Sequence, residues 1–165
     1  MKIVTCSAIA LSLAVLGFSS AAQAQTKKLF FEGDIVRHAL EGQQGPFCVL
    51  NNQYKRKEAV AWRIRVLDGT TGAQADDKAL KSVVVLLGNG QKLPAKFGGH
   101  GRPPTDFFWS LFWTIPADFP TGSLGYKVVA TLMDGTEQTW EPFKRDSTQL
   151  TVIAGEPPMA PPKQP

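Results

Sequence analysis

The soft metal ligands of this sequence are few and widely spaced. His38, Cys48 and His100 carry imidazole and thiol groups, and Met133 and Met159 add thioethers. Copper and zinc prefer thiolate and imidazole ligands, and glycines flank His100, so its side chain could reach a metal ion. One hypothesis is therefore a copper or zinc site built from Cys48 and His100, with His38 as a further ligand. The alternative is that Cys48, in a Phe-Cys-Val-Leu run with no second ligand nearby, is a small buried core residue.

The motifs that organise catalytic sites are missing from the sequence. It contains no G-x-S-x-G nucleophile elbow, no P-loop, no H-E-x-x-H pair and no C-x-x-C-H haem attachment site. Arg102 and Asp106 could form a local ion pair, which is more often a structural contact than a site. We therefore expect a protein that is not an enzyme and has no cofactor, apart from the copper or zinc considered above.

Net charge argues against a nucleic-acid partner. The 18 Lys and Arg residues and 14 Asp and Glu residues give a formal charge of +4, and the two signs are interspersed along the chain. Nucleic-acid-binding domains gather their basic residues on one face or stripe. The sequence predicts no such surface.

Residues 1–24 have the pattern of a secretory signal peptide. Lys2 precedes an apolar run from Ala8 to Phe18, and Ala22-Gln23-Ala24 places small residues where a signal peptidase reads them. The run is shorter than the roughly 20 residues that span a bilayer, although an uncleaved anchor is the alternative. We expect a periplasmic or secreted domain of residues 25–154 with no membrane span. A disordered, Pro-rich tail should follow at residues 155–165.

The densest aromatic stretch is Phe107–Pro116, which alternates with a period of two. Such alternation is typical of a strand with one face in a core. The face predicted to be buried consists of Phe107, Trp109, Leu111, Trp113 and Ile115. Phe108 and Phe112 lie on the opposite face, and an exposed apolar patch there would be large enough to receive a partner. Together with Trp140 or Tyr126, this face could also stack on a sugar.

Turn residues divide the chain into short strands. Asn89-Gly90 and Asp134-Gly135 each separate two apolar runs, which predicts two hairpins. Gly33-Asp34 predicts a turn or bulge between two further short strands, and residues 98–106 predict a mobile loop. No connection carries a long amphipathic helix. The sequence therefore predicts an all-β fold, an antiparallel β-sandwich. The predicted strands of the first hairpin are Ser82–Leu87 and Gln91–Phe97. Further strands are predicted at Phe47–Leu50, Val60–Val66 and Gln149–Ile153.

The order of these segments resembles bacterial immunoglobulin-like and macroglobulin-like domains. The polar turn YKRKE leads into the strand WRIRVLD, and a connector with the pattern IPADFPTGSLGY leads into a strand that ends in a DG hairpin. The resemblance covers about Phe47–Ala154. It differs at Lys57, where a glycine is common, and it brings no catalytic residues. It implies an immunoglobulin-like sandwich, a fold that hosts many unrelated roles.

The leading hypothesis for function is an exported, non-enzymatic binding or accessory module for a partner protein. Phe108, Phe112, His100 and Arg102 are the residues predicted to contact that partner. The two alternatives are a periplasmic copper- or zinc-binding protein that uses Cys48 and His100, and a carbohydrate-binding module that uses exposed aromatic side chains.

Overall fold

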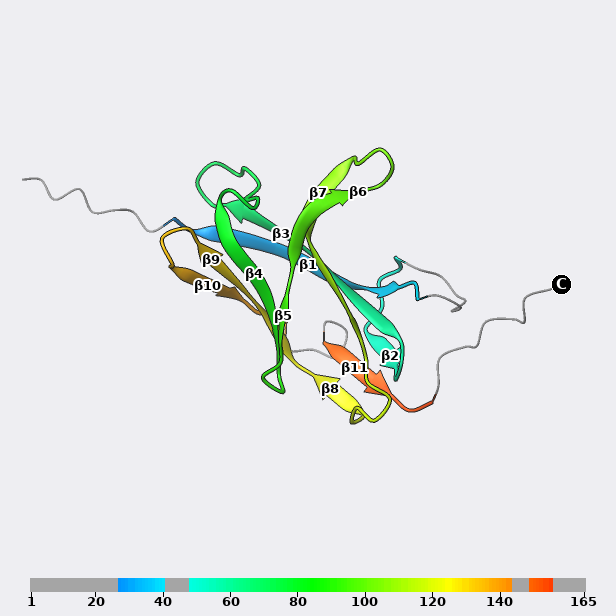
Figure 1. The fold of residues 1–165 in the computed structure, drawn as a ribbon. Helices are drawn as coiled ribbons and strands as arrows, with labels where there is room; N and C mark the ends of the chain where they lie inside the picture. Colours follow the sequence, from blue (N-terminus) through cyan, green and yellow to red (C-terminus); the bar gives the residue numbers. More distant parts are fainter. Residues whose placement is uncertain (1–26, 41–47, 144–148, 156–165) are drawn as a thin grey trace, which may run out of the picture.

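The computed structural model describes residues 27–40, 48–143 and 149–155, which form strands and turns and contain no helix (Figure 1). The predicted signal peptide, most of the predicted tail and the segment 41–47 lie outside the described residues. The first sheet consists, in spatial order, of β1 (Leu29–His38), β3 (Ala59–Asp68), β7 (Asp106–Thr114) and β6 (Lys96–His100). The second consists of β10 (Glu137–Trp140), β9 (Tyr126–Leu132), β4 (Leu80–Leu87) and β5 (Lys92–Pro94). The third consists of β2 (Gln53–Lys55), β11 (Leu150–Ile153) and β8 (Gly122–Leu124).

One hydrophobic core unites the three sheets. In β3 and β9 every second side chain is buried, including Trp62, Ile64 and Val128, and the same core cluster contains Tyr54 and Leu150 from the third sheet. The alternation arises because successive side chains of a strand point to opposite faces. The two four-stranded sheets share this core, which is the arrangement of a β-sandwich. The predicted all-β class is therefore confirmed.

Both large sheets are antiparallel throughout, but the third sheet is mixed. β11 runs parallel to β2 and antiparallel to β8. The prediction of a purely antiparallel fold is wrong at this one pair.

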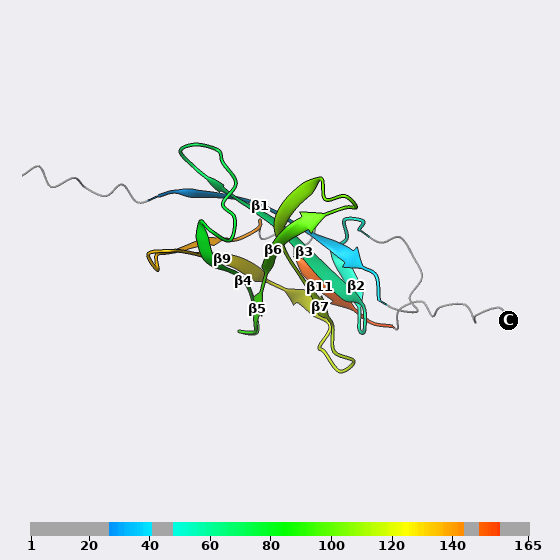
Figure 2. The same ribbon diagram turned by 45° about the horizontal axis from the view of Figure 1, so that its top comes forward.

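A single stretch of chain belongs to both large sheets. The predicted strand Gln91–Phe97 is divided at Ala95, since β5 pairs with β4 while β6 pairs with β7 (Figures 1 and 2). The buried Ala95 donates its N–H to the carbonyl of Val83 at 2.9 Å, which keeps the crossing point inside the core. The sheets are therefore joined on the β5–β6 side, and β1 and β10 are the outer strands on the other side.

The predicted hairpins at Asn89-Gly90 and Asp134-Gly135 are present. Gly90 and Gly135 have φ angles of 87° and 89°, a conformation that glycine adopts without steric cost. The predicted loop at residues 98–106 is shorter than expected. Gly98, Gly99 and His100 belong to β6, and the turn that follows is closed by a hydrogen bond from Thr105 N–H to the His100 carbonyl at 3.0 Å.

The aromatic strand β7 buries Trp109, Leu111 and Trp113 as predicted, but its first two aromatic residues exchange roles. Phe107 is 46% exposed, because it lies near the end of the sheet, where its ring stacks against Phe97. Phe108, on the outer face, is 8% exposed, since the His100 ring lies over it with a centroid distance of 5.6 Å.

The predicted turn at Gly33-Asp34 does not exist, because β1 is one continuous strand that pairs with β3 along its whole length. Gly33 occurs there because the Trp140 ring lies against it, and an added Cβ would be 3.1 Å from Trp140 Cζ3. Asp34 accepts two hydrogen bonds from Arg63, at 2.8 and 2.6 Å.

Candidate binding site

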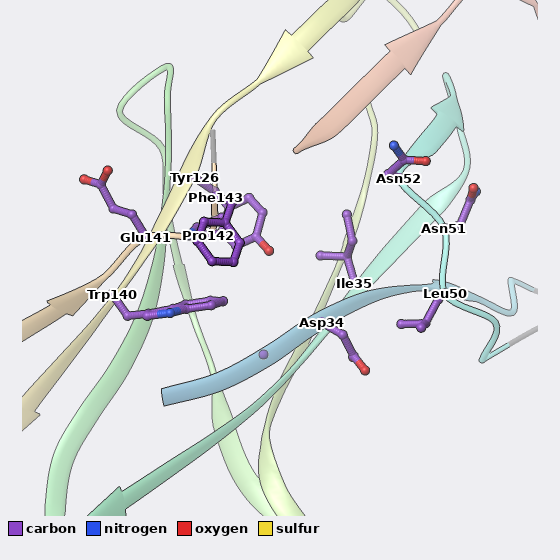
Figure 3. A pocket seen from close by; sticks show the side chains of 11 residues that line it. Asp34, Ile35, Leu50, Asn51, Asn52, Tyr126, Trp140, Glu141, Pro142 and Phe143 are labelled. Atoms are coloured by element: carbon purple, nitrogen blue, oxygen red, sulfur yellow. The ribbon is translucent and has the colours of Figure 1, made fainter. Parts of the chain in front are cut away.

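A pocket of about 520 Å³ opens between β1 and the end of β10, on the side where the two large sheets are not joined (Figure 3). We refer to it as the edge pocket. Four separate segments of the chain line it: Gly33, Asp34 and Ile35; Leu50, Asn51 and Asn52; Tyr126; and Trp140, Glu141, Pro142 and Phe143. A second hollow, of about 610 Å³, shares Tyr126, Glu141 and Pro142 but is otherwise lined largely by the glycine-rich turns after β4 and β8.

Aromatic side chains form the inner wall of the edge pocket. The Trp140 ring lies against Gly33, and the ring of Tyr126 meets Trp62 edge-on with centroids 5.8 Å apart. Burial raises the pKa of Tyr126 to about 12. Its hydroxyl is therefore uncharged at neutral pH, and the inner wall adds no charge to the pocket.

The mouth of the pocket exposes large apolar side chains. Phe143 is 80% exposed and Leu50 is 66% exposed, and the two lie on opposite sides of the opening. Exposed apolar surface that borders a pocket is typical of a binding site.

A buried ion pair holds the chain that forms one end of the pocket. Glu58 is 2% exposed; its carboxylate accepts a hydrogen bond from Lys55 N–H at 2.8 Å and lies 3.4 Å from Arg37 Nη2. The contact with Lys55 fixes the turn after β2, and the contact with Arg37 ties that turn to β1. The segment 50–55 is thereby held against the edge of the first sheet.

The backbone of β1 forms the floor of the opening. The Arg37 carbonyl accepts a hydrogen bond from Cys48 N–H at 2.9 Å, and the Ile35 carbonyl accepts one from Asn51 N–H at 3.3 Å. Both bonds lie on the side of β1 that faces away from β3. Because strand residues alternate in the direction of their backbone groups, Gly33 and Phe31 also direct their N–H and C=O groups to that side.

The outer face of the first sheet brings together most residues predicted to bind a partner. His38 stacks on Phe112 with centroids 4.7 Å apart, and His100 covers Phe108. Phe112 is 66% exposed, whereas the buried Phe108 is not available to a partner. Arg102 is exposed in the turn between β6 and β7.

The predicted pair of Arg102 and Asp106 is replaced by another contact. Asp106 accepts a hydrogen bond from Arg65 at 2.5 Å, and this contact lowers the pKa of its carboxyl. The pair ties β7 to β3.

The prediction that Cys48 is a buried core residue is wrong. Cys48 is exposed and has a φ angle of 57°, so the chain bends where an apolar strand was expected. Phe47 lies outside the described residues, and Leu50 forms only an isolated bridge with Val36.

Cys48 and His100 lie far apart, so they do not form the pair on which the metal hypothesis depends. Cys48 is hydrogen-bonded at the Arg37 end of β1, whereas His100 pairs with Asp106 at the opposite end of the sheet. Through the register of the sheet, His38 is level with Thr114 of β7 and His100 is level with Asp106. These two positions are eight residues apart, roughly 26 Å at about 3.3 Å per residue. Across residues 27–40, 48–143 and 149–155, no group of three or more His, Cys, Asp or Glu side chains could hold a metal ion.

The edge pocket contains three residues for which the sequence predicts no binding role, namely Gly33, Leu50 and Phe143. Of the residues that line it, the sequence predicts a binding role for Trp140 and Tyr126 alone. Gly33 carried a usable signal, since a glycine inside a strand often marks the close approach of another group.

In comparisons with known proteins, no family model, curated protein or solved structure matches this chain. In the described part of the chain, no helix is long and apolar enough to cross a membrane.

Proposed function

We propose that the chain is an exported, non-enzymatic, immunoglobulin-like module that binds a partner protein at the edge pocket. The observation that carries the proposal is an aromatic pocket with exposed apolar side chains at its mouth, directly beside an open strand edge. The signal-peptide pattern of residues 1–24 supports export to the periplasm or beyond, and the joined pair of sheets is compatible with the resemblance to immunoglobulin-like domains.

The proposal moves the contact surface from the outer face of the first sheet to its edge. On the outer face Phe108 is covered, and Phe112 is as exposed as Leu50 but has one ring face stacked on His38 and does not line the edge pocket. At the mouth of the edge pocket, Leu50 and Phe143 expose more than half of their surface. Burial of such side chains contributes roughly 1.5–3 kcal/mol each, which favours this region as the anchor of an interface.

A protein partner fits this pocket better than a sugar does. Sugar binding needs free aromatic faces and free amide groups, whereas one side of the Trp140 ring packs against Gly33. The amide of Asn51 exchanges hydrogen bonds with the backbone of Gln53, and Asn52 has partners of its own. The lining that remains for a ligand is mainly apolar.

Site-specific photo-crosslinking in the producing cells tests the proposal. A benzoylphenylalanine at position 143 or 50 should crosslink to one discrete protein, and Trp140→Ala should abolish the product. The matched control is the same group at Met133, which is 63% exposed but does not line the pocket. Equal crosslinking from positions 143 and 133, or none from 143 and 50, would refute binding at the edge pocket.

A further inference from the structure

Among the described residues, the outer edge of β1 is open over a short and well-defined length. At one end, Leu29 N–H donates to Gln138 Oε1 at 2.9 Å, and the Gln138 amide donates to the Lys27 carbonyl. At the other end, Asn51 N–H binds the Ile35 carbonyl. Between these two contacts, Phe31 and Gly33 direct backbone N–H and C=O groups outward, and no other segment among the described residues hydrogen-bonds to them.

We propose that the partner adds an extended segment as a further strand along Phe31–Ile35, so that its main chain completes the first sheet. This inference rests on the proposed function of the edge pocket and names its ligand class. An open strand edge is a template for pairing with another chain, and such pairing uses main-chain hydrogen bonds for affinity and side-chain pockets for specificity.

The faces of β1 specify the side chains of the added segment. A residue opposite Gly33 would direct its side chain to the inner face, into the edge pocket and beside the Trp140 ring that covers Gly33. Its two neighbours would lie on the outer face, beside Glu32 and Asp34. The side chain of Glu32 is 62% exposed and lies 4.0 Å from Arg65, whereas Asp34 is already matched by Arg63. The segment therefore carries an apolar residue for the pocket and a Lys or Arg beside Glu32.

Two other occupants of this edge are disfavoured by their chemistry. A second copy paired antiparallel about Gly33 would place Glu32 opposite Asp34, and like charges in directly opposed positions destabilise a sheet. The chain's own C-terminal segment, residues 157–165, contains five prolines, which have no N–H to donate to a ladder. A segment of a different protein meets neither obstacle.

The probe is a set of seven-residue peptides, selected from a random phage-displayed library on the folded chain and then synthesised. Selected peptides should carry an apolar residue with a Lys or Arg next to it, and they should lose binding to Trp140→Ala. Methylating single backbone nitrogens should weaken binding about tenfold or more at every second residue and little at the residues between, because only alternate N–H groups face β1. Strand addition would be refuted if N-methylation weakened binding without the two-residue period. It would also be refuted if no selected peptide lost binding to Trp140→Ala.

Amide hydrogen exchange on the full chain with the best peptide gives a second readout. The amides of Phe31 and Gly33 should slow about tenfold or more, as expected for newly formed main-chain hydrogen bonds. Those of Glu32 and Asp34, which face β3, should change less. Protection that appears along β10 and not at Phe31 and Gly33 would contradict the proposal.

A charge reversal tests the side-chain rule and separates the two proposals. Glu32→Lys should weaken basic peptides and strengthen peptides in which the basic residue is replaced by Glu, while Met133→Lys should do neither. If crosslinking from position 143 succeeds but the methylation period is absent, the edge pocket binds a partner by another geometry. If crosslinking fails as well, the proposed function fails with it.

Discussion

Removing the buried carboxylate of Glu58 should destabilise the protein strongly, even though the residue lies in a polar turn. Glu58→Ala removes the charge-assisted hydrogen bond that the carboxylate accepts from Lys55 N–H, which is worth about 1.5–3 kcal/mol. It also leaves Arg37 without its carboxylate partner. Breaking a fully buried pair costs about 3–5 kcal/mol. Because the Arg37 side chain keeps 23% of its surface exposed, we expect the lower end of that range, about 3 kcal/mol.

Urea unfolding, followed by tryptophan fluorescence, measures this loss as a lower midpoint with an unchanged slope. Glu32→Ala is the control, because Glu32 is exposed and its ion pair with Arg65 is 4.0 Å long, so its loss should be below about 0.5 kcal/mol. The double variant Arg37→Met with Glu58→Ala should lose less than the sum of the two single variants. A loss below about 1 kcal/mol for Glu58→Ala would refute the view that this pair anchors segment 50–55.

Three further outcomes follow from burial and ionisation. Trp113 is 9% exposed and lies edge-on to Phe119, so Trp113→Ala should lower the free energy of unfolding by about 3–5 kcal/mol, as measured with urea. A loss below about 1 kcal/mol would place this side chain outside the core. Hydrogen bonds from Lys27 and from backbone amides lower the pKa of Asp68 from 3.8 to about 2. Its contribution to stability is therefore complete above pH 4 and lost as pH falls toward 2, so Asp68→Asn should flatten acid unfolding in that window. Burial raises the pKa of Tyr126 from 10.0 to about 12, so its contribution is complete below pH 10 and lost as pH rises toward 12. Tyr126→Phe should reduce the alkaline fall of the urea midpoint, and an unchanged fall would show that the hydroxyl is solvated.

Local signals predicted those parts of the fold that depend on local geometry. The two hairpins follow from turn residues that tolerate positive φ, and the buried faces of β3 and β7 follow from strict alternation. The same kind of signal failed at Gly33-Asp34. There the residues reflect partners far along the chain, namely the Trp140 ring and the Arg63 guanidinium, and not a turn.

The edge pocket could not be predicted because four distant segments form it. Nothing in the neighbourhood of Leu50 or Phe143 reveals that the two residues face one opening. Cys48 was misjudged for a related reason: apolar neighbours suggested a core strand, but its positive φ angle and its backbone bond to Arg37 place it at the surface of β1.

The passage of β5 directly into β6 makes the two sides of the sandwich mechanically unequal. On that side, the backbone at the buried Ala95 passes from one sheet to the other, so covalent bonds hold the two sheets together. On the other side, the contacts between β1 and β10 include two hydrogen bonds of Gln138. Because such contacts are weaker than covalent bonds, we expect the two sheets to separate there first. We therefore expect thermal opening of the sheets to widen the edge pocket before it disturbs the core near Ala95. A strand bound along β1 would add contacts on the side where the sheets are not covalently joined, and it would thereby make the whole domain more rigid.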